Sequence, residues 1–136
     1  MVIRWSLIVK IIGKMNIDDL QVYKLSMELS DKIWLSVGTW KYFEKDTLGK
    51  QLVRAADSIA ANLSEGFGRY SFKENQHFCY YSRGSLYETR CWLTKAYERK
   101  LISEDEYLGF NKEIDVLGVK LNNYIKSIGN TPDDNK

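Results

Sequence analysis

The last third of the chain carries an uninterrupted helical repeat of apolar residues. Spacings of three and four residues alternate through Tyr107, Phe110, Ile114, Leu117, Leu121, Tyr124 and Ile128. An α-helix with about 3.6 residues per turn places all these side chains on one face. Ser103 and Glu106 form a capping-box pattern before the repeat and Gly129 follows it, which predicts a helix over 103–129. Because that apolar face must be packed, the rest of the chain has to supply its partners.

Three further segments show a helical period and are predicted as helices over 18–40, 47–67 and 72–100. Residues 41–46 are polar and are interpreted as a connection, and residues 101–102 form a joint so short that it forces an antiparallel return. No segment alternates as a β-strand does, and 1 proline and 9 glycines supply few turns. The sequence therefore predicts an all-α protein, an antiparallel up-down-up-down four-helix bundle over residues 16–129.

The expected core faces of these three helices follow from the same spacing. On helix 18–40 the face is Leu20, Tyr23, Met27, Trp34 and Val37, widened by Val22, Leu25, Leu29 and Ile33. On helix 47–67 it is Leu52, Ala56, Ile59, Leu63 and Gly66. On helix 72–100, which Ser71 and Glu74 are expected to cap, it is Phe78, Ser82, Ser85, Thr89, Trp92 and Ala96.

The formal charge of the 136-residue chain is only +2 and is unevenly distributed. Arg4, Lys10 and Lys14 give residues 1–15 a charge of +3 with no acid, so residues 16–136 carry −1. Bulk charge thus gives no argument for nucleic-acid binding, which would need a local patch. Residues 1–15 are an apolar, basic extension or sequence upstream of a start at Met15; they are too short to span a bilayer, and a membrane-surface helix is a third interpretation. Residues 130–136 are expected to be a disordered tail.

The residues that usually carry catalysis or bind metals are sparse. Cys79 and Cys91 lie on one predicted helix, roughly 18 Å apart, so they cannot form a disulfide and suit a reducing cytoplasm. His77 is the single histidine, and neither Glu65 nor Glu88 has a histidine three residues later, as di-iron bundles require. We therefore expect no catalytic residues, no metal and no cofactor, and a protein that is not an enzyme.

A polar row lies beside the apolar seam of helix 47–67: Gln51, Arg54, Ser58, Asn62, Glu65 and Arg69. Ser58 and Asn62 are short side chains, which are unusual on a fully solvated helix face. The row is either a set of structural hydrogen bonds that docks a neighbouring helix or a surface that contacts a ligand.

A second row, here named the tyrosine–arginine row, lies on helix 72–100: Tyr80, Arg83, Tyr87, Arg90, Thr94 and Tyr97. Tyrosine and arginine are enriched at subunit interfaces, and the same pair stacks on bases and contacts phosphates. Subunit contact, nucleic-acid contact and a plain solvated face remain open alternatives. A glycine inside a helix costs about 1 kcal/mol relative to alanine and is usually kept where another backbone comes close. Gly84 and Ser85 are therefore expected to mark a close helix crossing.

The segment RAADSIAANLSEGFGR at 54–69 resembles the signature of the ribosomal-RNA intervening-sequence proteins. RGSLYE at 83–88 resembles their second signature, and the sequence at 19–23 fits their first helix. The resemblance covers about residues 18–128. On these positions it implies signature or structural roles for Ser58, Asn62, Glu65, Gly66, Gly84, Ser85 and Glu88. One departure is Val53-Arg54, where many family members carry two basic residues.

The resemblance also implies a four-helix bundle assembled as a homopentamer, related to accessory proteins of diversity-generating retroelements that bind nucleic acid and a polymerase. The expected function is a non-enzymatic oligomer that binds structured RNA or a nucleic-acid-processing protein. Its candidate nucleic-acid contacts are Arg54, Arg69, Arg83 and Arg90, and its candidate oligomer contacts are Tyr80, Tyr87 and Tyr97. The alternative is a protein-only oligomeric adaptor without a nucleic-acid ligand. No membrane partner is expected.

Overall fold

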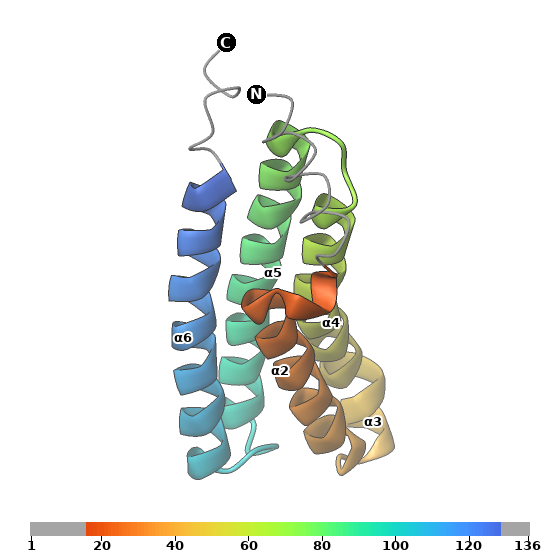
Figure 1. The fold of residues 1–136 in the computed structure, drawn as a ribbon. Coiled ribbons are helices and arrows are strands. Elements are labelled where there is room, and N and C mark those ends of the chain that lie inside the picture. Colours follow the sequence, from red (N-terminus) through yellow and green to blue (C-terminus); the bar gives the residue numbers. More distant parts are fainter. Residues whose placement is uncertain (1–15, 129–136) are drawn as a thin grey trace, which may run out of the picture.

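The computed structural model describes residues 16–128, which form an all-α bundle (Figure 1). A short 3₁₀ turn, Ile17–Asp19, precedes the first long helix. The four long helices are α2 (Gln21–Gly38), α4 (Lys50–Phe67), α5 (Phe72–Glu98) and α6 (Glu104–Ile128). Between α2 and α4 lie one helical turn, α3 (Tyr42–Glu44), and a π-helical turn, Lys45–Gly49. The predictions for residues 1–15 and 130–136 lie outside the described residues.

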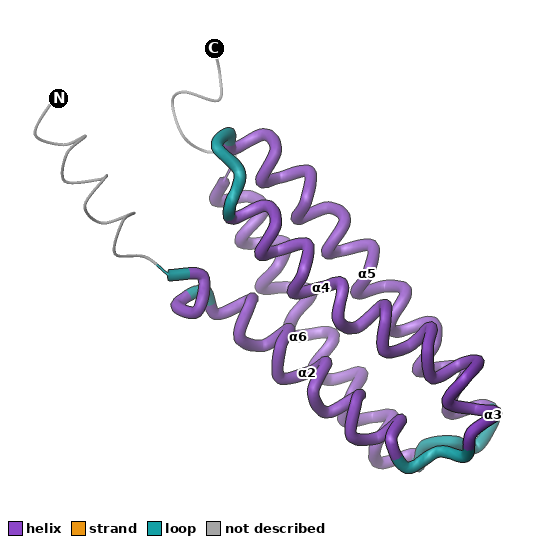
Figure 2. The backbone as a smooth tube through the Cα atoms, turned by 90° about the vertical axis from the view of Figure 1, so that its right-hand side faces the viewer, coloured by secondary structure: helices purple, strands orange, loops and turns teal. Residues whose placement is uncertain are grey.

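Each long helix packs against two neighbours, and all four neighbouring pairs are antiparallel. α4 contacts α2 and α5, while α6 contacts α5 and α2 (Figures 1 and 2). Between α5 and α6, Arg83 bonds to Asn122 whereas Thr94 bonds to Tyr107, so residue numbers rise on one helix as they fall on the other. The predicted up-down-up-down bundle is confirmed, with α2 and α4 on one side and α5 and α6 on the other.

The connection predicted at 41–46 is wrong, because the chain is already helical from Tyr42. The helical path runs through the π turn into α4, and Lys50 pairs with Asp46 one turn earlier at 2.7 Å. Gly49 allows this turn to lie against α2, since a Cβ at that position would be 2.8 Å from Val37 Cγ1. Polar residues alone do not indicate a loop, because an exposed helix face is polar as well.

The core faces of α4 and α6 agree with the prediction, whereas those of α2 and α5 are rotated. In α2 the buried side chains include Val22, Leu29 and Ile33, while Met27 and Trp34 are 41% and 64% exposed. In α5 the core residues are Cys79, Ser82, Leu86, Thr89, Leu93 and Ala96. Phe78, Ser85 and Trp92, expected in the core, are only partly buried. Both helices carry apolar residues on two adjacent faces, and packing against the neighbouring helices decides which face is buried.

The predicted caps of α5 and α6 are confirmed, whereas α2 and α4 begin three residues later than predicted, at Gln21 and Lys50. Ser71 Oγ accepts a hydrogen bond from the Glu74 amide, and Ser103 Oγ accepts one from the Glu106 amide, each at 3.1 Å. Within residues 16–128, no helix is both long and apolar enough to cross a membrane.

Candidate nucleic-acid interface

The tyrosine–arginine row lies along the side of α5 that adjoins α6. The row has two halves with different environments: an upper half, Tyr80, Arg83 and Tyr87, and a lower half, Arg90, Thr94 and Tyr97. Arg90, Thr94 and Tyr97 contact α6 side chains directly, whereas Tyr80 and Tyr87 are 44% and 63% exposed. Part of what the sequence suggested as an external surface is thus the contact between two helices of the same chain.

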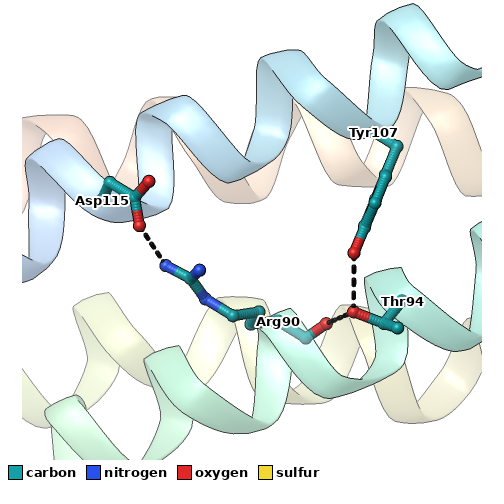
Figure 3. Close-up of polar contacts among 4 residues, drawn as sticks. All are labelled: Arg90, Thr94, Tyr107 and Asp115. Atoms are coloured by element: carbon teal, nitrogen blue, oxygen red, sulfur yellow. Dashed lines mark hydrogen bonds and ion pairs between the residues drawn. The ribbon is translucent and has the colours of Figure 1, made fainter.

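The lower half of the row fixes α5 to α6 (Figure 3). Arg90 forms an ion pair with Asp115, and the Thr94 and Tyr107 hydroxyls are 3.1 Å apart. Hydrogen bonding with Thr94, and then with Asn111, lowers the pKa of Tyr107. The Tyr107 ring also stacks on Tyr97 with 4.5 Å between centroids. These contacts engage Arg90 in an ion pair and Tyr97 in a ring stack, although Tyr97 is still 36% exposed. External contacts by these two residues stay a prediction.

The upper half of the row is open to solvent. The Arg83 guanidinium lies 5.1 Å from the centre of the Tyr80 ring and donates a hydrogen bond to Asn122 Oδ1 at 3.1 Å. Tyr87 stands on the same side and helps line a groove of about 200 Å³ between α5 and α6, with Val119 on the opposite wall. The arrangement presents a cation held against the exposed Tyr80 ring, with the exposed Tyr87 ring one turn further along α5. Such rings can stack on bases and such a cation can contact phosphate.

The polar row of α4 combines a helix-docking contact with contacts inside its own helix. The Ser58 and Ser85 hydroxyls are 2.5 Å apart and join α4 to α5. Asn62 donates to the Ser58 carbonyl at 2.8 Å, which leaves it within α4. Ser58 therefore makes a helix-docking contact, one of the two alternatives for the row, with Ser85 as its partner, and Asn62 does not bridge helices within the chain.

The close helix crossing expected at Gly84 is wrong, because Gly84 is exposed and a Cβ there would have no neighbour within 4 Å. The close approach is at Gly66 instead. A Cβ at Gly66 would be 2.7 Å from Asn75 Oδ1 and 2.9 Å from the Phe78 Cβ. α4 and α5 thus approach closely near the short joint between them.

The two glutamates of the signatures make contacts along their own helices. Glu65 pairs with Arg69 at 2.7 Å, and Glu88 accepts a hydrogen bond from Trp92 Nε1 at 3.1 Å. Both carboxylates belong to exposed residues. Neither fixes the packing of two helices within the chain, and a role in subunit contacts stays a prediction.

The four candidate arginines do not form one patch on a single chain. Arg54 lies near the start of α4 in a groove with α2, whereas Arg83 and Arg90 lie beside α6 on the other side of the bundle. Carboxylates neutralise two of the four, since Arg69 pairs with Glu65 and Arg90 with Asp115. Within residues 16–128, Arg54 and Arg83 form no ion pair.

The sequence missed the α6 residues that complete this site. Asp115 and Asn122 are seven residues apart and therefore share one side of α6, beside its apolar stripe. That spacing indicates a common face, but only the antiparallel register of α5 and α6 pairs the two residues with Arg90 and Arg83.

The described part of the chain offers few side chains for nucleophilic catalysis or metal binding. Cys79 is fully buried, and burial raises the pKa of its thiol to about 11. No group of three or more histidine, cysteine, aspartate or glutamate side chains in residues 16–128 is arranged to hold a metal ion.

Fold and surface define a small helical bundle with an open aromatic and cationic face. A family model described as 23S rRNA-intervening sequence protein matches residues 18–123, and the chain belongs to this family. Its fold is similar to the crystal structure of a protein with unknown function from the S23 ribosomal protein family of Bacteroides thetaiotaomicron. That structure is 22% identical with a TM-score of 0.69, and the match covers 77% of this chain and 98% of the other. No curated protein matches the chain.

Proposed function

We propose that this protein is a non-enzymatic, cytoplasmic, oligomeric helical bundle that binds structured RNA. A pentamer is the assembly that the family resemblance implies. The observation that carries the RNA proposal is the group Tyr80, Arg83 and Tyr87 on one side of α5. Both tyrosines are exposed, and the half-buried Arg83, which has no carboxylate partner, lies against the Tyr80 ring.

Assembly is part of the proposal because a single chain is nearly neutral. The described chain offers Arg54 and Arg83 as unpaired candidate arginines on different sides of the bundle. Several copies would bring equivalent arginines together, and weak phosphate contacts then add through multivalency. The name of the family, taken from 23S rRNA, is consistent with an RNA ligand.

The first test is native mass spectrometry of the full chain purified at low salt without nuclease. We expect an oligomer with additional mass that RNase removes. An oligomer without RNA, or a binding constant that does not change with salt, contradicts the proposal, because phosphate contacts release counterions.

Variants then test the surface. Arg83→Ala should weaken RNA binding about tenfold and reduce the slope of log affinity against log salt by about one per contacted phosphate. Arg69→Ala is the matched control, because Glu65 already neutralises that arginine. Equal losses in the two variants would mean that the group Tyr80, Arg83 and Tyr87 is not the contact surface.

A protein-only adaptor is the second candidate, and the exposed Tyr87 favours it because tyrosine and arginine are enriched at subunit interfaces. The double variant Arg83→Ala/Tyr87→Ala separates the two functions. Loss of the oligomer would identify an interface, whereas an intact oligomer with reduced RNA binding would identify a ligand surface. Arg90 is left unchanged because its removal would disturb the α5–α6 contact.

A further inference from the structure

A second groove lies between the C-terminal end of α2 and the N-terminal end of α4, on the side of the bundle away from the tyrosine–arginine row. We name it the α2–α4 groove; its volume is about 530 Å³. Trp34, Val37 and Val53 supply apolar walls, and Trp34 is 64% exposed. An indole left open in an apolar groove is the kind of anchor point that dominates protein binding.

The α2–α4 groove is basic, and two acidic residues lie just beyond it. Lys45, Lys50 and Arg54 line the groove, and Asp46 neutralises only Lys50. Asp31 and Asp57 lie one turn further along α2 and α4, and within residues 16–128 neither forms an ion pair. Burial, and then the nearby Asp31 carboxylate, raise the pKa of Asp57, so the two carboxylates are close enough to interact between α2 and α4.

We propose that the α2–α4 groove binds an amphipathic helix of a partner protein. Apolar side chains of that helix pack on Trp34, acidic ones meet Lys45 and Arg54, and basic ones meet Asp31 and Asp57. Lys50 and Asp57 are seven residues apart on α4, about 10 Å, which matches two turns of a bound helix with anchors at i, i+3 or i+4 and i+7. This site is separate from the proposed RNA surface and does not depend on it.

The charge pattern argues against two other occupants. Residues 1–15 of this chain are apolar but carry three cations and no acid, so their charge conflicts with the lysines and arginine that line the groove. A nucleic-acid strand along the groove would place phosphates beside Asp31 and Asp57. A helix with both signs of charge matches both the basic groove and the aspartate pair just beyond it.

The test measures binding of three fluorescein-labelled 14-residue helical peptides to the full chain by anisotropy. All three peptides have leucines at i, i+3 and i+7; one has glutamates at one end and lysines at the other, one has only glutamates and one only lysines. We expect the two-sign peptide to bind at least tenfold more tightly than the others. Equal affinities overturn the proposal.

Two variants test the anchor and the charge. Trp34→Ala should lower the affinity for the two-sign peptide at least tenfold. Leu35→Ala should not, because Leu35 is 71% exposed but lies outside the groove. Lys45→Glu/Arg54→Glu should make the all-lysine peptide the tightest ligand. Because these side chains are exposed, we expect circular dichroism to show unchanged folding.

Other occupants give distinct results that overturn the proposal. If Trp34→Ala lowers the native mass of the assembly, a second copy of this chain fills the groove. If a 12-nucleotide RNA displaces the peptide and loses its own binding in Trp34→Ala, the groove is a nucleic-acid site instead.

Discussion

Two thiols with opposite environments provide the simplest test of the structure at the scale of single residues. Cys79 is fully buried in α5, and burial raises the pKa of its thiol to about 11, while Cys91 is exposed on the same helix. Because the thiolate is the reactive form, we expect one thiol per chain to react with Ellman's reagent at pH 8 in the native protein. Both should react in guanidinium chloride. Rapid reaction of both thiols in native protein would contradict this packing.

The Asp31–Asp57 pair, beside the α2–α4 groove, should lower stability at neutral pH. Burial and the Asp31 carboxylate raise the pKa of Asp57 above its ordinary value. The unfolded chain therefore loses this proton at lower pH than the folded chain, so stability falls as pH rises through that range and stays lower above it. We expect Asp57→Asn to raise Tm at pH 7 by about 1–3 °C and to have little effect well below the ordinary aspartate pKa. Asp46→Asn, which removes the partner of Lys50, should give no such increase.

At the scale of helices, two glycines should respond oppositely to alanine. At Gly66 a new Cβ meets Asn75 and Phe78 at less than 3 Å, so Gly66→Ala should destabilise the fold by about 1–3 kcal/mol. Gly84 lies in an exposed part of α5 with open space around it, and Gly84→Ala should stabilise by up to about 1 kcal/mol. Urea unfolding monitored by circular dichroism measures both. If Gly84→Ala is less stable than the unchanged protein, that result would instead support the close helix crossing that the sequence suggested at Gly84.

The helices themselves could be predicted from the sequence, but their orientation could be predicted for only half of them. In α4 and α6 the apolar residues form one narrow stripe, and that stripe is the core face. In α2 the apolar residues around Trp34 and those around Ile33 lie on two neighbouring faces of the helix. Both groups follow the helical period, so the period does not show which face is buried. Only the positions of α4 and α6 beside α2 decide that Ile33 is buried and Trp34 is exposed.

The candidate site was predictable to the same limited degree. Residue types and spacing identified the tyrosine–arginine row, because they depend on one helix only. The distinction between the fixed and open halves of the row depends on Asp115, Tyr107 and Asn122 of α6, and thus on the register of two helices. Periodicity within a helix carries no information about that register.

At the scale of the whole molecule, the separation of the arginines predicts how many RNA molecules each assembly binds. Since Arg54 and Arg83 lie on different sides of one bundle, we expect a single chain to bind RNA weakly. Tight binding should then require the assembly, with one RNA per assembly rather than one per chain. Sedimentation velocity over a concentration series, with absorbance at 260 and 280 nm, measures this ratio. Equal affinity of the dissociated chain would contradict it.

The order in which the chain connects the helices also affects how quickly the protein folds. Most neighbouring helices are consecutive in the chain, and the α4–α5 pair is closed by a joint of only a few residues beside Gly66. Only the pairing of α2 with α6 joins the two ends of the described chain. Local contacts form early because short loops cost little entropy to close, so α4 and α5 are suited to be the folding nucleus. The protein should refold within microseconds to milliseconds, with α2 and α6 closing the bundle last.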